Sequence, residues 1–411
     1  MALDTHATAP RGLRGSAQEF LVRVRGGDLG SLPVIVGLIV ICAVFQLLTP
    51  RFLSSQNLVD LTQQMTAVGT VAIGIVLVLL LGEIDLSVGS VSGLAAAVLA
   101  VTWLQGPLSF LPSALQLPVA ILAALVIGVL VGLLYGFLRT RFGVPSFVFT
   151  LAGLLAFLGL QLFVLGNTGS INLPPESPIV QFGQQWFLPT WLSYVLVGFA
   201  VVAYGWTQVS RARRRAEVGL SSTSLLVIAL RAAGLLVVLG GAVWYLGLTR
   251  GVSSRFLLFL LLVVLVHLAL TRTRWGRSVY AIGGNVEAAR RAGIRVNRVY
   301  VSVFVLCSSL AALGGLLAAS RLGAVNQSSG GSDFNLNAIA AAVIGGTSLF
   351  GGRGSAFSAL LGTIVIMSIS SGLTLLNPDP AIRYMVTGAV LLLAVVIDSL
   401  SRRSRAASGM A

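Results

Sequence analysis

Long apolar stretches, separated by short polar or arginine-bearing segments, make up most of this chain. A helix needs about 20 apolar residues to cross a bilayer core of about 30 Å. Because several stretches are short or rich in glycine, we expect ten to twelve membrane helices. The expected spans are 33–49, 58–82, 88–104, 117–138, 146–165, 190–207, 224–248, 256–271, 298–321, 335–350, 355–376 and 383–399.

The composition agrees with this pattern. Of the 411 residues, 56% are hydrophobic and only 9% are charged, and the mean hydropathy is +0.96. A soluble domain carries about 25% charged residues. The chain is therefore predicted to be an all-α polytopic membrane protein.

Every one of the 27 basic residues is arginine, and the net charge is +15. The arginines lie mainly between the expected spans, which fits the positive-inside rule better than a nucleic-acid surface, so we expect no nucleic-acid partner. The absence of lysine excludes the phosphate-binding loop, whose lysine contacts nucleotide phosphates. If transport here depends on ATP, a separate subunit must hydrolyse it.

The placement of arginine also predicts the orientation. With the N-terminus inside, 21 arginines fall on the inner side and five on the outer side, while Arg231 falls within a span. This asymmetry predicts that both termini are cytoplasmic. The expected parts are a cytoplasmic tail (1–31), a transmembrane permease domain (32–400) with an insertion that adds a helix (208–255) and a cytoplasmic coupling loop (272–297), and a second cytoplasmic tail (401–411).

Glu83 and Asp85 are the only acids between Asp60 and Glu176, and long apolar runs flank them. A carboxylate in hydrocarbon costs roughly 2.5–3.5 kcal/mol, and irregular backbone at membrane depth persists only inside protein or beside a polar cavity. We therefore expect a broken helix whose carboxylates line or gate a route for a polar solute. Two alternatives remain open. Asp85 caps a helix that begins at Leu86, or an inner arginine forms an ion pair with one of the acids.

A second polar break, 345–352, precedes Arg353-Gly354-Ser355, much as the first break precedes Val88-Gly89-Ser90. Corresponding breaks in two halves of a transporter indicate its solute pathway, although glycine- and serine-rich segments also resemble each other by chance. The weak repeat predicts broken helices in two related halves. Amide side chains before the apolar run from Val68, among them Gln63 and Gln64, either bind a neutral polyol or simply lie in the outer interface. The candidate pathway or gate residues are Gln63, Gln64, Glu83, Asp85, Ser87, Gly89, Ser90, Gly345, Gly346 and Thr347.

A short helix is expected in the long inner loop, over about 286–292. Asn285 is a good N-cap, and Gly293 is a natural stop. A rigid helix here would suit contact with a motor subunit, with small alanines sitting closely in its cleft; an ordinary solvated connector is the alternative. The candidate coupling residues are Gly284, Asn285, Glu287, Ala288, Ala289 and Gly293.

Three stretches occur in order within about 50–350: Gly82-Glu83-Ile84-Asp85-Leu86-Ser87-Val88-Gly89-Ser90, the loop from Gly284-Asn285 to Gly293-Ile294, and Ala338 through Gly354. Together they resemble the permease subunits of bacterial monosaccharide ABC importers of the ribose, xylose and galactose type. The resemblance implies an inner-membrane permease that works as a pair with a two-domain ATP-binding subunit and an extracytoplasmic sugar-binding protein. The longer region 208–255 resembles the xylose permease in length, which favours a pentose.

Other classes of protein fit the sequence less well. A secondary transporter that uses Glu83 or Asp85 as a proton site would need no ATPase, and the helix at 286–292 would then lack a purpose. Nothing in the sequence indicates a membrane enzyme, because no nucleophile–base set or metal-spaced cluster occurs. We expect no catalytic residues, no metal and no cofactor, with ATP bound by the partner subunit.

Overall fold

The structure is a computed structural model that describes residues 32–377, except 220–221, and a few positions between 379 and 392. Among the described residues, eight helices are long and apolar enough to cross a membrane, and three apolar helices are shorter. The long ones are α3 (Ser55–Leu80), α5 (Ser113–Phe142), α6 (Ser146–Leu165), α8 (Thr190–Glu217), α9 (Leu225–Gly247), α10 (Ser254–Arg272), α13 (Val296–Leu322) and α15 (Ala356–Leu376). The shorter ones are α2 (Leu32–Leu48), α4 (Val88–Leu104) and α14 (Ser332–Ile344).

The expected polytopic all-α class is confirmed, and each expected span up to 355–376 corresponds to a helix. The expected span 383–399 lies mostly outside the described residues. The expected span 335–350 is too long, because α14 ends at Ile344. Gly345 caps that end and Gly346 has φ 96°, a left-handed conformation that a helix cannot continue through. The apolar residues after Ile344 belong to a turn.

The chain divides into two compact units. In one of them, the described part of Phe187–Val252, α8 and α9 pack against each other as a hairpin. A hydrogen bond of 2.8 Å from the Leu188 N–H to the Val252 carbonyl closes its base. The described remainder of the chain forms the other unit. That 208–255 is an insertion stays a prediction.

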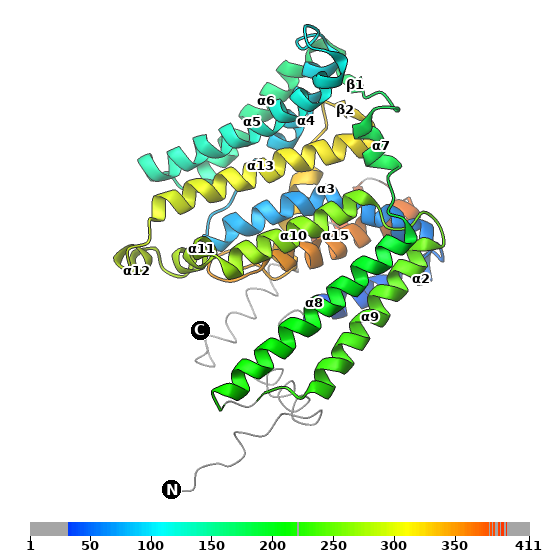
Figure 1. Cartoon of the computed structure of the whole chain (residues 1–411). Coiled ribbons are helices and arrows are strands. Elements are labelled where there is room, and N and C mark those ends of the chain that lie inside the picture. The colour runs from blue at the N-terminus through cyan, green and yellow to red at the C-terminus, as the bar shows by residue number, and fades with distance from the viewer. Residues whose placement is uncertain are drawn as a thin grey trace. The chain divides into compact units, whose positions relative to one another are not determined.

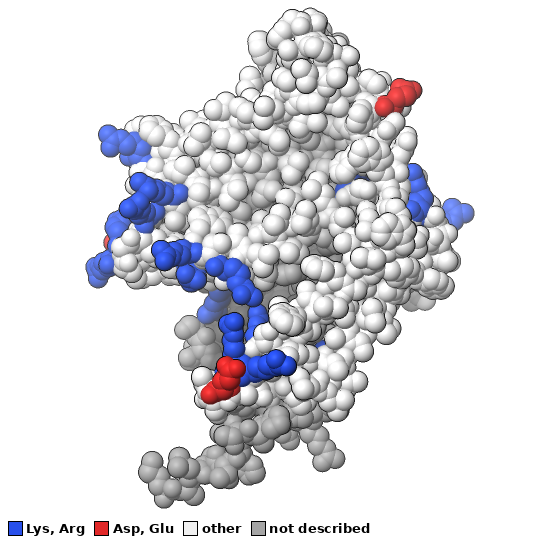
Figure 2. Space-filling view, viewed as in Figure 1, with Lys and Arg blue, Asp and Glu red and all other residues white. Residues whose placement is uncertain are grey.

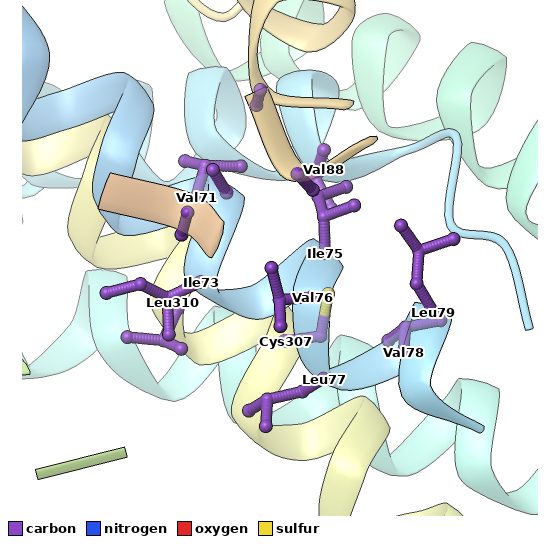
Figure 3. Close-up of a cluster of buried hydrophobic side chains, with 14 of the residues drawn as sticks. Val71, Ile73, Ile75, Val76, Leu77, Val78, Leu79, Val88, Cys307 and Leu310 are labelled. Atoms are coloured by element: carbon purple, nitrogen blue, oxygen red, sulfur yellow. The ribbon is translucent and has the colours of Figure 1, made fainter. Parts of the chain in front are cut away.

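Within the larger unit, α13 packs on α5, α3 and α4 (Figure 1). Its neighbour α3 is the most buried of the long helices, because its central turns carry apolar side chains on every face. Figure 3 shows side chains from Val71 to Leu79 pointing outward in several directions around α3. Val88, Cys307 and Leu310 belong to the same buried cluster. This core holds the first break, after Leu80, against α13.

The connector 166–189 is more ordered than a plain loop. It contains a short 3-10 helix, η2 (Gly166–Thr168), the strand β1 (Ser170–Asn172) and α7 (Pro178–Gln184). β1 pairs antiparallel with β2 (Ala324–Asn326), with Ile171 opposite Val325. These are the only strands among the described residues. The small sheet ties the connector to the end of α13.

Two short helices follow α10. They are α11 (Arg274–Gly284) and α12 (Val286–Arg291). The helix expected at about 286–292 is therefore confirmed, and the Asn285 side chain caps it by accepting from the Ala288 N–H at 2.9 Å. Gly293 follows with φ 80°. Arginine side chains gather on this side of the larger unit (Figure 2). From α11 to the start of α13 the chain carries Arg274, Arg277, Arg290, Arg291, Arg295 and Arg298.

Candidate transport and coupling site

The first break runs from Leu81 to Ser87, and an ion pair holds it. The Nε of Arg139, near the end of α5, donates to Oε1 of Glu83 at 2.6 Å. The Glu83 side chain is 9% exposed and that of Arg139 is 28% exposed. The guanidinium of Arg139 also lies 5.0 Å from the centre of the Tyr300 ring. The ion-pair alternative for Glu83 is therefore confirmed.

Asp85 is buried and organises the start of α4. Its Oδ1 accepts from the N–H of Ser87 at 2.8 Å and from the hydroxyl of Ser87 at 2.7 Å. The hydroxyl of Tyr135 donates to Ser87 Oγ at 2.7 Å. The helix begins at Val88 with Ser87 as its N-cap residue, so a helix beginning at Leu86 is wrong. Asp85 still satisfies a free backbone donor at this helix start.

The N-terminal ends of α4 and α14 meet. Asn335, in the first turn of α14, donates from Nδ2 to the Leu86 carbonyl at 2.8 Å and accepts from the Gly89 N–H at 3.3 Å. A Cβ atom on Gly89 would lie 2.6 Å from the carbonyl oxygen of Gly330. With 17 and 13 residues, α4 and α14 are about 25 and 20 Å long, too short for the bilayer core. Two partial helices thus join end to end through one asparagine.

Hydrogen bonds that involve α6 close this junction. Ser90 donates from its hydroxyl to the Leu154 carbonyl at 2.8 Å. Gln161 donates from Nε2 to the Ser329 carbonyl at 3.0 Å, and its Oε1 has no hydrogen-bond partner. Ser90 and Gln161 are both buried. Apart from Oε1 of Gln161, these polar groups therefore bond to protein in this conformation.

Gln63 lies on α3, away from the first break. The backbone carbonyl of Gln63 accepts from one guanidinium nitrogen of Arg255 at 3.0 Å. A second guanidinium nitrogen of Arg255 donates to the backbone carbonyl of Leu317 at 3.1 Å. Arg255 is fully buried, and its Nε has no partner. Gln63 is buried, whereas Gln64 is partly exposed. The side chain of Arg255 thus links α10 to α3 and α13.

The second break lies between α14 and α15. Gly345 packs against the Ser358 carbonyl, whereas no atom lies within 4 Å of a Cβ built on Gly346. Thr347 is fully buried, its Oγ1 has no hydrogen-bond partner, and Gly354 packs against it. The candidate residues of the first break lie between α3 and α4, and those of the second break lie between α14 and α15. Their role in a pathway stays a prediction.

The coupling candidates divide by exposure. Glu287 and Ala288 are exposed on α12, and Glu287 forms a 3.1 Å ion pair with Arg290. Ala289 is buried in the core of the larger unit, because the Ala289 face of this six-residue helix turns toward α13. The expectation that Ala289 sits in a partner's cleft is therefore wrong. A Cβ atom on Gly284 would meet no atom within 4 Å, so a methyl group fits at this position.

Tyr280 fastens α11 to the second break. Its hydroxyl donates to the Gly354 carbonyl at 2.8 Å. Burial raises the pKa of Tyr280 above its ordinary value, so the hydroxyl stays protonated and keeps its donor. Trp275, one turn before, donates from Nε1 to Ser302 on α13 at 2.8 Å. These two bonds and the buried residues Val279 and Ile282 fix α11 against the bundle.

Sequence reasoning missed several of these residues. Arg139 and Arg255 entered it only as charges that report orientation. Their signal was a cation at the end of an apolar run, which needs a partner there. Asn335 carried a similar signal, as an amide opening an expected apolar span. No cluster of three or more potential metal ligands occurs among the described residues.

Comparisons with known proteins identify the family. Residues 57–395 match the family described as the branched-chain amino acid transport system / permease component. The xylose transport system permease protein of Escherichia coli K12 is 39% identical over 355 residues, covering 86% of this chain and 87% of that protein.

Two further relatives agree. The xylose transport system permease protein of Haemophilus influenzae is 36% identical, covering 93% of this chain and all of its own length. The ribose import permease protein of Escherichia coli K12 is 30% identical, covering 89% of this chain and 92% of its own. No solved structure matches. The chain therefore belongs to the permease family of ABC importers that includes branched-chain amino acid and sugar permeases.

Proposed function

We propose that this chain forms the membrane passage of an ABC importer for a monosaccharide, and that its substrate is a pentose such as xylose. The observation that carries the proposal is the identity of 39% and 36% to two xylose permeases over nearly the whole chain, against 30% to a ribose permease. ABC importer permeases have no ATPase site, and the absence of lysine agrees with ATP binding elsewhere.

The assembly that we propose has two copies of this chain, a two-domain ATP-binding subunit and an extracytoplasmic sugar-binding protein, in a bacterial inner membrane. Reconstituted with the last two, the chain should take up labelled xylose in preference to ribose, and only with ATP. Uptake should persist after the proton gradient is collapsed. ATP-independent uptake driven by a proton gradient would instead favour the secondary transporter with Glu83 or Asp85 as its proton site.

The proposed topology puts both termini in the cytoplasm. It rests on the 21-to-5 arginine asymmetry. A cysteine at the exposed Ser170 and a cysteine at Ser404 should react with a membrane-impermeant reagent from opposite sides. Labelling of both from one side would contradict the proposal.

We assign the passage to the two breaks, with Gln63 and Gln64 on α3 toward its outer end. The polar groups of the first break are paired in this conformation, so a passage there requires the broken helices to separate. Replacing Glu83 and Asp85 together with Leu removes both carboxylates but suits lipid. The variant should still insert, with a lower unfolding temperature because Arg139 and the donors of Ser87 lose their partners, and it should lose uptake. Wild-type uptake would show that the two acids are incidental.

The proposed contact for the ATP-binding subunit is the exposed face of α12. It presents Glu287, Ala288, Arg290 and Arg291, whereas Asn285 and Gly293 fix its two ends. A short helix capped at both ends is a rigid surface on which nucleotide-driven closure can act.

A further inference from the structure

Three glycine-bearing turns from distant parts of the chain meet at one point. Gly82 follows α3 in the first break, Gly283 lies at the end of α11, and Gly351 and Gly352 lie in the second break. We call these four residues, with the carbonyl of Leu80, the glycine junction. Gly82, Gly351 and Gly352 have φ values of 77°, 88° and 73°, a conformation that favours glycine.

The backbones of the glycine junction touch directly. The N–H of Gly352 donates to the Leu80 carbonyl at 2.9 Å. A Cβ atom on Gly283 would overlap the Leu80 carbonyl oxygen and lie 2.6 Å from the Gly352 nitrogen. A Cβ on Gly351 would lie 2.7 Å from the Gly283 carbonyl oxygen and 2.9 Å from the Gly82 nitrogen. At each of the four glycines, the atoms nearest to a built Cβ belong to backbone rather than to flexible side chains.

The glycine junction is next to the proposed ATPase contact. Gly283 is separated from α12 only by Gly284 and the capping Asn285. The bond from Tyr280 to Gly354 attaches the same helix, α11, to the second break at another point. Close-packed contacts transmit strain rather than absorb it. A displacement of α11 and α12 therefore reaches Leu80, before the first break, and Gly352, within the second, through one contact.

We propose that the glycine junction couples the ATPase contact to both broken helices at once, and that Gly283 is its positioning residue. This inference rests on the proposed function as an importer permease. Simultaneous movement of both breaks would separate the joined ends of α4 and α14 in a single step.

Gly283→Ala tests the proposal, and Gly284→Ala is its matched control. The two glycines are adjacent, and neither has the left-handed φ that would strain alanine. Only the methyl group at 283 meets neighbouring backbone. In the complex reconstituted with ATPase and binding protein, we expect Gly284→Ala to keep stimulated ATP hydrolysis and sugar uptake. Gly283→Ala should keep basal hydrolysis but lose both stimulation and uptake. Coupled uptake by Gly283→Ala at the control rate would overturn the inference.

A second measurement keeps the proposal testable if Gly283→Ala does not fold. Spin labels at Gly284→Cys and Arg353→Cys, in a Cys42→Ala background, report the distance across the glycine junction; Cys307 is fully buried. A non-hydrolysable ATP analogue should leave this distance unchanged while it shifts the distance between labels at Arg353→Cys and Ser170→Cys. A change across the junction would overturn the inference. A wild-type complex without stimulated hydrolysis would refute the proposed function instead.

Discussion

Arg139 reaches from α5 to Glu83, and their 2.6 Å contact fixes the stretch between α3 and α4. The two residues are 56 positions apart in the chain. Glu83 is nearly buried, so its charge depends on this partner. In this conformation the pair fastens the first break to α5.

We expect Arg139→Gln and Glu83→Gln each to lower the free energy of unfolding by roughly 1–3 kcal/mol, because each leaves a poorly solvated charge without its partner. The double variant should lose less than the sum of the two. Thermal unfolding of the purified protein in detergent measures all three. Additive losses would show that the contact contributes little.

Asp85→Asn should retain the fold, since its remaining carbonyl oxygen can accept both hydrogen bonds from Ser87. Asp85→Leu removes that acceptor and leaves buried donors of Ser87 unpaired, a loss of roughly 1–3 kcal/mol. Unfolding temperatures of the two variants compare the effects. Equal stability would show that capping is unimportant at this position.

Tyr280→Phe should lower the free energy of unfolding by about 0.5–1.5 kcal/mol through loss of the bond to Gly354. The pKa of Tyr280 is raised in the folded protein, so its contribution is fully present below pH 10 and declines as the pH rises above that value. The unfolding midpoints of wild type and Tyr280→Phe should differ below pH 10 and should converge as the pH rises above 10. Parallel curves would contradict the assignment.

Ala288→Glu and Ala289→Glu form a matched pair on α12. Ala288 is exposed, so its variant should insert and unfold like wild type, within about 0.5 kcal/mol. It should nevertheless fail to recruit its ATPase. Ala289 is buried, and a glutamate there should lower the free energy of unfolding by at least roughly 1–3 kcal/mol. Co-purification and unfolding temperature separate the outcomes; normal ATPase recruitment by Ala288→Glu would remove α12 from the coupling role.

The sequence predicted the helices well because apolar length alone determines a membrane span. It also predicted α12, since an N-cap and a glycine stop are local signals. It did not predict where α14 ends, because Leu349 and Phe350 extended the expected span past the glycines at 345 and 346. Apolar length therefore indicates that a helix is present, whereas caps and glycines indicate where it begins and ends.

The candidate site was less predictable, because its contacts join residues far apart in the chain. The acids Glu83 and Asp85 were found as costly charges, but the choice between passage, cap and ion pair depended on Arg139 and Ser87. The inward turn of Ala289 depends on how α12 lies against α13. The glycine junction had only a weak signal, namely glycines beside polar breaks. Which of those turns meet is a property of the packed bundle.

The buried guanidinium of Arg255 has a consequence for the order of assembly in the cell. One of its acceptors, on α3, is synthesised before it, and the other, on α13, is synthesised after it. A charged side chain is unfavourable in lipid until it finds partners. The end of α10 that carries Arg255 therefore reaches its final position only once α13 has entered the membrane. Biogenesis of this bundle is thus not strictly sequential, and a truncated chain that ends before Leu317 would leave α10 incompletely docked.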